Sequence, residues 1–250
     1  MFQALTRQRF KRTSYLPSIG EYSTGESMLI DPLDLKHVLI TGSTRGGKSS
    51  YINSMINVLQ YFDTTLYGVD CKRLELKPWS NVFQDIAVDI SGVLPVLEAV
   101  NNVMNERLDY LDSQGLRKWP SKDRIVLVID EMHQALAVDY SLDDKEAKAD
   151  QRHRMDLLTR IAQLGLASGV HLILSTQTAY HDQLPGQLKN NLDVRICCKV
   201  NSPEMLKSGL GFSHGLDHQA IPPYPGSAYI VGLPDCLFQP RIGRAYWVET

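Results

Sequence analysis

The segment Gly42-Ser43-Thr44-Arg45-Gly46-Gly47-Lys48-Ser49 stands between an apolar run, residues 37–41, and a helix-like segment, residues 50–59. Its glycines and its terminal Lys-Ser pair have the spacing of a phosphate-binding loop. Glycines let backbone N–H groups approach phosphate oxygens, and the following helix N-terminus adds partial positive charge. We expect Lys48 to reach the β- and γ-phosphates and Ser49 to bind Mg²⁺. The residues expected to contact the nucleotide are Gly42, Ser43, Thr44, Arg45, Gly46, Gly47, Lys48, Ser49 and Ser50.

Apolar runs of strand length alternate with segments of helical periodicity along the chain. Ile52, Met55, Ile56 and Leu59 form an i, i+3, i+4, i+7 stripe, which is typical of a helix that packs on a sheet. Strands that alternate with helices predict an α/β fold, in which a mostly parallel sheet is covered by helices on both faces. The expected strands are residues 37–41, 66–70, 86–89, 125–129, 170–177 and 190–200, with shorter ones near 28–30, 226–231 and 244–248; the expected helices are 50–59, 93–111 and the segment through 157–164.

Two carboxylates, Asp130 and Glu131, follow the apolar strand at residues 125–129. A strand this apolar is buried on both faces, so carboxylates at its end need a cation nearby. Bound Mg²⁺ would be that cation, held by Asp130, commonly through water, together with Ser49. Glu131 would then orient and deprotonate the water that attacks the γ-phosphate.

Composition limits the possible classes. The chain has 250 residues, of which 43% are hydrophobic, enough for one large domain. Its net charge of −2 gives no overall basic field, so any DNA contact must be local. The four cysteines lack CxxC spacing and are expected to be reduced thiols of a cytoplasmic protein. No apolar run approaches the roughly 20 residues of a membrane span, so we expect a soluble chain.

Several segments together resemble the motor domain of the FtsK/SpoIIIE family, within the FtsK–HerA superfamily. The resemblance covers roughly residues 20 to 235. The segments that match are the phosphate loop, Val69-Asp70-Cys71-Lys72-Arg73-Leu74-Glu75-Leu76, residues 125–131, residues 162–177, residues 185–191 with Arg195, and residues 225–229.

This resemblance implies a RecA-like P-loop ATPase that forms a ring, usually a hexamer, and pumps double-stranded DNA through its centre at the expense of ATP. By the same likeness Gln177 would sense the γ-phosphate, although a polar strand end can also be a helix cap or turn. Arg195 would be the finger that reaches the nucleotide of the next subunit; the alternative is an ordinary salt bridge on a strand face. An arginine aimed at the transferred phosphate raises the rate by about 10³ to 10⁵.

DNA would be gripped by two loops that face the pore, one before residue 125 and one in the charged stretch 139–154. A mixed-sign run such as 139–154 is otherwise usually a solvated loop. Contacts of this kind would be with phosphates, independent of sequence and sensitive to salt. The expected DNA-binding residues are Arg117, Lys118, Lys122, Lys145, Lys148, Arg152 and Arg154.

We expect a basic N-terminal arm at residues 1–19 and the motor domain at residues 20–250. The arm could lie along DNA, a membrane surface or a neighbouring subunit, or be a solvated tail. With no membrane span or winged-helix module expected, the chain looks more like compact motors of mobile elements, of plasmid-transfer or phage type. Arg45 departs from the family pattern, because a small residue is common there. Two alternatives remain: a nucleotide-switched assembly module, and a genome-packaging or protein-secretion ATPase of the same superfamily.

Overall fold

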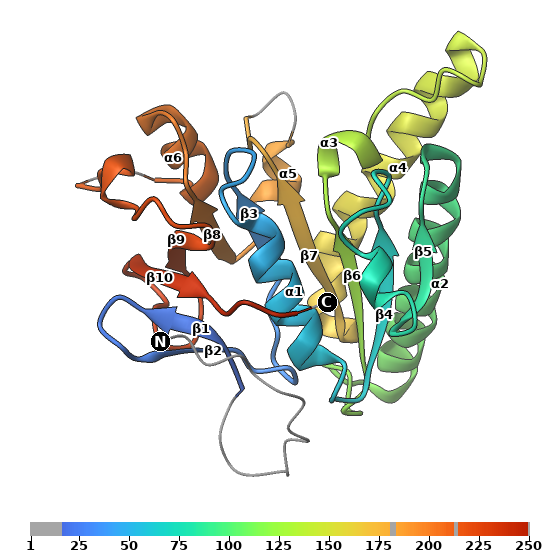
Figure 1. Ribbon diagram of the computed structural model, residues 1–250. Coiled ribbons are helices and arrows are strands. Elements are labelled where there is room, and N and C mark those ends of the chain that lie inside the picture. The colour runs from blue at the N-terminus through green and yellow to red at the C-terminus, as the bar shows by residue number, and fades with distance from the viewer. Residues whose placement is uncertain (1–16, 181–183, 213–214, 250) are drawn as a thin grey trace.

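The fold is built on one large sheet, seen in a computed structural model that describes residues 17–180, 184–212 and 215–249 (Figure 1). The strands are β1 (Ser18–Tyr22), β2 (Ser27–Leu29), β3 (Val38–Thr41), β4 (Thr64–Val69), β5 (Phe83–Ala87), β6 (Arg124–Ile129), β7 (Val170–Thr176), β8 (Val194–Cys198), β9 (Ser227–Val231) and β10 (Arg241–Ala245). The helices are α1 (Lys48–Leu59), α2 (Ile90–Gln114), α3 (Met132–Ala135), α4 (Asp144–Ser168), α5 (Gly186–Lys189) and α6 (Pro203–Leu210), with short 3₁₀ turns η1 (Lys77–Trp79) and η2 (His218–Ala220).

The sheet has a parallel half and an antiparallel half. Its order is β2-β1-β10-β9-β8-β3-β7-β6-β4-β5. The strands from β8 to β5 in this order are all parallel, whereas β9, β10, β1 and β2 extend the sheet antiparallel beyond β8. The parallel half confirms the α/β fold expected from the alternating strands and helices.

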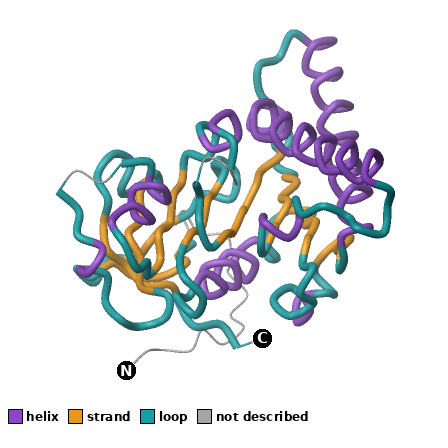
Figure 2. The backbone as a smooth tube through the Cα atoms, turned by 90° about the horizontal axis from the view of Figure 1, so that it is seen from above, coloured by secondary structure: helices purple, strands orange, loops and turns teal. Residues whose placement is uncertain are grey.

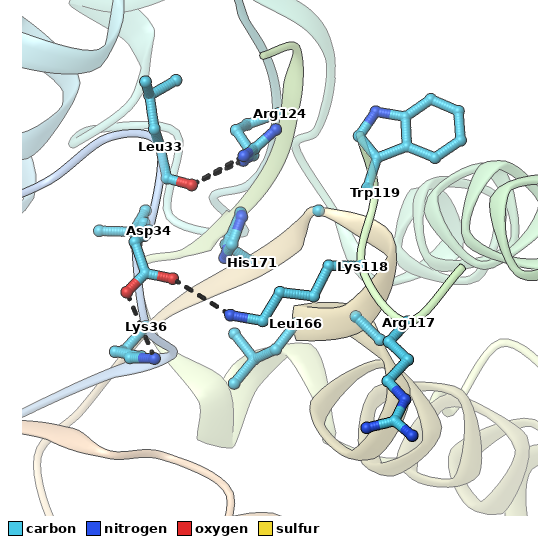
Figure 3. Close-up of a pocket in the computed structure, with 12 residues that line it drawn as sticks. Leu33, Asp34, Lys36, Arg117, Lys118, Trp119, Arg124, Leu166 and His171 are labelled. Carbon is cyan, nitrogen blue, oxygen red and sulfur yellow. Dashed lines mark hydrogen bonds and ion pairs between the residues drawn. The ribbon is translucent and has the colours of Figure 1, made fainter. Parts of the chain in front are cut away.

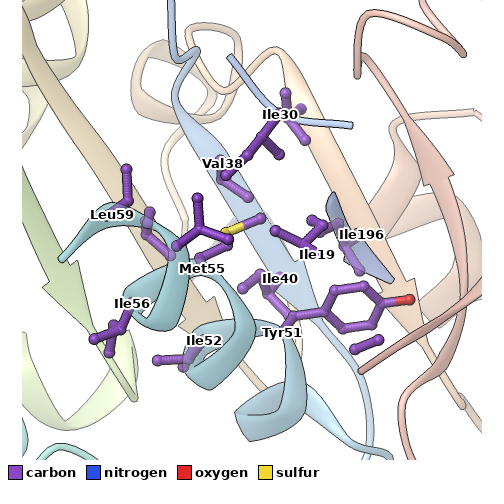
Figure 4. Close-up of a cluster of buried hydrophobic side chains, with 14 of the residues drawn as sticks. Ile19, Ile30, Val38, Ile40, Tyr51, Ile52, Met55, Ile56, Leu59 and Ile196 are labelled. Carbon is purple, nitrogen blue, oxygen red and sulfur yellow. The ribbon is translucent and has the colours of Figure 1, made fainter. Parts of the chain in front are cut away.

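Helices cover both faces of the parallel half because neighbouring residues of each strand point to opposite sides. On β3, Val38 and Ile40 pack with α1 in one buried cluster, drawn in Figure 4, while Leu39 packs in a second cluster with α2 and α4. Figure 2 shows the strands lying between these helices. The face that carries Leu39 continues onto β8, where Cys197 packs against α6. All the described residues of β3 and β7 are buried, as their apolar sequences predicted.

Three expectations about element boundaries need correction. Most of the stretch 139–154 is helical, because α4 begins at Asp144 and Asp143 caps it by accepting hydrogen bonds from two amides of its first turn. The last strand is β10, Arg241–Ala245, a few residues earlier than expected, because its pairing with β1 aligns Ala245 with Gly20. The boundary expected between residues 19 and 20 falls inside β1; residues 1–16 of the expected arm lie outside the described residues.

Two buried histidines lie close together where β3 and β7 begin: His37 directly precedes β3, and His171 is the second residue of β7. The His37 side chain is fully buried and its Nδ1 accepts a hydrogen bond of 2.9 Å from the Leu172 amide. The His171 ring lies 6.4 Å from it, centroid to centroid, and neither of its nitrogens has a hydrogen-bond partner among the described residues. Burial lowers the pKa of His37 to about 4 and that of His171 to about 3.

This pair predicts acid sensitivity of the fold. An unfolded histidine has a pKa of about 6.5. Below that pH the two imidazoles are protonated in the unfolded chain but stay neutral in the folded chain. The free energy of unfolding should therefore fall as the pH drops from 6.5 towards 4, by roughly 3 kcal/mol for His37 alone. Urea unfolding at pH 7 and pH 5 measures this loss. The control is His171→Phe, which keeps a ring and forfeits no hydrogen bond; an equal loss in this variant would contradict the role of His171.

Candidate active site

The phosphate loop connects β3 to α1 at the carboxyl edge of the parallel strands, as expected. Gly47 begins the helix with a φ of 98°, a left-handed conformation that glycine adopts readily. A Cβ on Gly47 would lie 1.8 Å from the amide nitrogen of Gly226, the residue before β9. The same Gly226 amide donates a hydrogen bond of 3.2 Å to the carbonyl of Gly46. The loop is therefore held by backbone contact with the antiparallel half of the sheet.

The first turn of α1 offers donors to an anion. It has no side-chain cap and no acidic residue. Lys48 folds back over the loop, and its Nζ donates to the Gly42 carbonyl at 2.8 Å and to the Ser43 carbonyl at 3.4 Å. Burial lowers the pKa of Lys48, while the nearby Glu131 carboxylate opposes that shift. Ser49 and Ser50 lie half-buried in the first turn, and the buried Ser43 hydroxyl has no hydrogen-bond partner among the described residues.

Thr44 and Arg45 are exposed at the tip of the loop. Arg45 has a φ of 62°, in the left-handed region that non-glycine residues enter at a cost of about 1 to 3 kcal/mol. Such strain gathers at functional sites, and the Arg45 side chain is exposed at the tip of the loop.

Asp130 and Glu131 follow β6 and lie beside the phosphate loop at the same edge of the sheet. Both are only 6% exposed, and the Asp130 amide donates to the Val69 carbonyl at 3.1 Å. Burial, helped by the neighbouring Glu75 and Asp70 carboxylates, raises the pKa of Asp130 to about 7. A buried carboxylate whose negative form is this disfavoured is stabilised by a cation.

The donor set fits Mg²⁺ rather than a metal enclosed by protein ligands. Among the described residues no group of three or more His, Cys, Asp or Glu could hold a metal ion. Mg²⁺ typically takes one or two protein oxygens and completes its shell with water and substrate phosphates. The oxygens of Asp130 and Ser49 would hold it in that manner, and when bound it would neutralise charge on the phosphates.

Glu131 makes contacts that the sequence only partly predicted. Its carboxylate accepts from the Gln177 amide at 3.3 Å and from the Gln177 side chain at 3.5 Å, so the structure brings these two expected residues together. Its other neighbour, Lys72, donates to Glu131 Oε2 at 3.5 Å and was not among the expected site residues. The signal was available, because Lys72 lies in the polar loop after β4, at the carboxyl edge where parallel sheets bind ligands.

The sequence model of the FtsK/SpoIIIE family matches residues 5–134, which include the phosphate loop and both carboxylates. The chain belongs to the FtsK/SpoIIIE family. It is 29% identical over 248 residues to the DNA translocase FtsK of Tropheryma whipplei, an alignment covering 89% of this chain and 30% of that protein. It is 25% identical over 250 residues to the DNA translocase SpoIIIE of Bacillus subtilis, covering 90% of this chain and 29% of that protein. The chain thus spans less than a third of the length of these relatives.

Solved structures show the same fold. The pCW3 conjugation coupling protein TcpA, in its monomer form with ATPgS, superposes with a TM-score of 0.83 at 20% identity, covering 99% of this chain and 70% of that one. The cytoplasmic domain of the type VII secretion ATPase EccC from Thermomonospora curvata gives a TM-score of 0.67 at 21% identity, covering 98% of this chain and 30% of that one. The RecA-like architecture implied by the FtsK/SpoIIIE resemblance is confirmed.

Arg195, the finger expected from the FtsK/SpoIIIE resemblance, is bound within its own chain. Its Nη2 donates to the Lys189 carbonyl at 2.7 Å and its Nε to the Leu192 carbonyl at 3.1 Å. The third nitrogen, Nη1, is buried without a partner among the described residues, and burial lowers the pKa of the guanidinium. Among the described residues, Arg195 forms no salt bridge on the strand face either. Arg195 would reach a neighbouring nucleotide only by giving up both carbonyls.

The structure does not bring the expected DNA-binding residues together. Lys145, Lys148 and Arg152 are exposed on the first half of α4, whereas Arg117, Lys118 and Lys122 are exposed in the loop before β6. That loop contacts the other end of α4, where the Trp119 amide donates to the Ala167 carbonyl at 2.8 Å. At 1.5 Å per residue, Lys145 and Ala167 are about 33 Å apart along the helix.

The prediction that Arg154 binds DNA is wrong. Its side chain is fully buried and donates to the Asp150 carboxylate and to the Ala135 and Ala137 carbonyls. It lies on the inner side of α4 because the stretch 139–154 is helical rather than a loop, so helical periodicity directs one residue in three or four towards the core.

Proposed function

We propose that this chain binds ATP with Mg²⁺ and hydrolyses the γ-phosphate bond. The observation that supports this most is the placement of Lys48, Asp130 and Glu131 at one edge of the sheet, with Gln177 and Lys72 on the Glu131 carboxylate. Lys48 and the amides of the first turn of α1 would hold the phosphates. Glu131, held from two sides, would take the proton of the attacking water, and Gln177 would respond to the γ-phosphate through the same carboxylate.

We further propose that hydrolysis drives the movement of double-stranded DNA. The relatives in Tropheryma whipplei and Bacillus subtilis are DNA translocases, and their alignments cover 89% and 90% of this chain. Six exposed basic residues, three on the first half of α4 and three in the loop before β6, would contact DNA phosphates independently of sequence. The plasmid-transfer or phage type remains our proposal for the biological setting, with a cytoplasmic location supported by four free cysteines.

A ring of several copies, six by resemblance to the family, would complete the motor. We propose that two arginines face the neighbouring subunit. They are Arg45, exposed and left-handed at the tip of the phosphate loop, and the half-buried Arg195.

Among the described residues, no helix is both long and apolar enough to span a membrane.

The deciding experiment measures ATP hydrolysis with and without linear double-stranded DNA, at low and at high salt. We expect DNA to stimulate hydrolysis, and the stimulation to fade as salt rises, because phosphate contacts release counterions. The double variant Lys148→Ala/Arg152→Ala should weaken the stimulation while leaving the DNA-free rate unchanged. A rate of hydrolysis that DNA does not change would contradict translocation but not the ATPase activity. No hydrolysis, with or without DNA, would contradict both proposals.

A further inference from the structure

A cavity lies at the edge of the sheet where the parallel strands begin, opposite the edge that carries the phosphate loop; Figure 3 shows the residues that line it. It has a volume of about 260 Å³ and opens where the parallel strands begin, beside the first residue of β6 and the second of β7. We call it the basal pocket. The polar residues that line it are Asp34, Lys36, Arg117, Lys118, Arg124 and His171.

The basal pocket is strongly basic in a chain that is slightly acidic overall. Its four Lys and Arg side chains and one carboxylate give a formal charge of +3, against −2 for the whole chain. Lys36 Nζ lies 3.6 Å and Lys118 Nζ 3.9 Å from the two oxygens of Asp34. One carboxylate therefore already sits between two ammonium groups that enter from separate segments. Arg117 makes no ion pair with any described residue, so its positive charge at the rim of the pocket is not compensated by a carboxylate.

The floor of the basal pocket is formed by Arg124 and His171. Arg124 Nη2 and Nε both donate to the Leu33 carbonyl, at 2.7 and 3.1 Å, which joins the segment before β3 to the start of β6. His171 is 3% exposed, and both of its ring nitrogens are closed off from solvent. The side chains open to a ligand are therefore the exposed cations at the mouth of the pocket, above all Lys118 and Arg117.

We propose that the basal pocket binds a phosphate group, held by Lys36 and Lys118 with Arg117 at the rim. A phosphate has two charges and several acceptor oxygens, which match several cationic donors better than one carboxylate does. A volume near 260 Å³ is below the 300 to 1,000 Å³ of sites that enclose drug-sized molecules, so the pocket encloses a phosphate or diphosphate but not a whole nucleotide. The group belongs either to a free anion or to a DNA backbone.

The Asp34 carboxylate gives the proposal a distinctive test, because it competes with the ligand for both lysines. Asp34 is 62% exposed, so Asp34→Asn should leave the fold intact. That variant should bind pyrophosphate several-fold more tightly, whereas Lys36→Ala and Lys118→Ala should each bind at least tenfold more weakly. Lys207→Ala, an exposed lysine on α6 that does not line the cavity, is the control and should change nothing.

Binding is measured by isothermal titration calorimetry with pyrophosphate and with a short DNA duplex, all in a Lys48→Ala background that disables the phosphate loop. Pyrophosphate binding with the expected pattern of variants supports a site for a free anion. The same pattern with the duplex supports a site for a backbone phosphate. The proposal is overturned if neither probe binds, if Lys207→Ala weakens binding as much as Lys118→Ala, or if Asp34→Asn does not tighten it.

Discussion

Glu131→Gln should lower the rate of ATP turnover by about 10²- to 10⁴-fold and leave ATP binding nearly unchanged, the range that a positioned general base contributes. The amide keeps the size of the side chain and can still meet Gln177, but it cannot accept a proton from water. Binding depends instead on Lys48 and the first turn of α1, which the substitution does not touch. Steady-state hydrolysis and binding of a fluorescent ATP analogue measure the two effects separately.

Lys72→Ala is the informative companion to this variant. It removes the ammonium that lies 3.5 Å from Glu131 Oε2 but leaves the carboxylate and its contacts with Gln177. We expect a smaller loss of turnover, about tenfold, because Lys72 only positions the base; Lys72→Arg should recover part of it. If the Glu131→Gln variant hydrolysed ATP at the full rate, Glu131 would not be the general base, whatever the effect of the Lys72 variants.

Gly47→Ala should abolish nucleotide binding and lower the free energy of unfolding by several kcal/mol. Two costs add: an alanine at a φ of 98° is strained by about 1 to 3 kcal/mol, and its Cβ would stand 1.8 Å from the Gly226 nitrogen. The clash cannot be relieved by a flexible side chain, since Gly226 meets the loop with its backbone. Urea unfolding and nucleotide titration measure the losses.

The chain supplies its own control for the second cost. Gly25 has a φ of 87°, but a Cβ there would meet nothing within 4 Å. Gly25→Ala should therefore show the conformational cost alone, about 1 to 3 kcal/mol, with nucleotide binding intact. If Gly47→Ala were no worse than Gly25→Ala, the contact between the phosphate loop and Gly226 would have no energetic importance.

The sequence predicted the parallel half of the sheet well, because strands such as β3, β6 and β7 are short apolar runs. The family resemblance implied a γ-phosphate role for Gln177, and the structure places Gln177 on the Glu131 carboxylate. The sequence prediction failed where charge was used to infer exposure. Arg154 belongs to a run of mixed charge that looked solvated, yet a helix turns one face of any run inwards.

Other features could not be predicted because they depend on contacts distant in sequence. Gly226 meets Gly47 from a distant part of the chain, and the Arg195 guanidinium is held by carbonyls in and just after α5. The basal pocket assembles residues from before β3, from the β6 loop and from β7. None of these segments is unusual by itself; only the sheet order places them together.

The buried Arg154 ties α4 to the segment that follows Glu131. Its guanidinium holds the carbonyls of Ala135 and Ala137, and α3 begins immediately after Glu131. If ATP binding displaced Glu131, α3 would carry that movement to a helix about 37 Å long. One end of that helix displays Lys145 and Lys148, and the other supports the loop of Lys118. A single arginine thus joins the end of β6 to the helix whose two ends lie at the two groups of exposed cations.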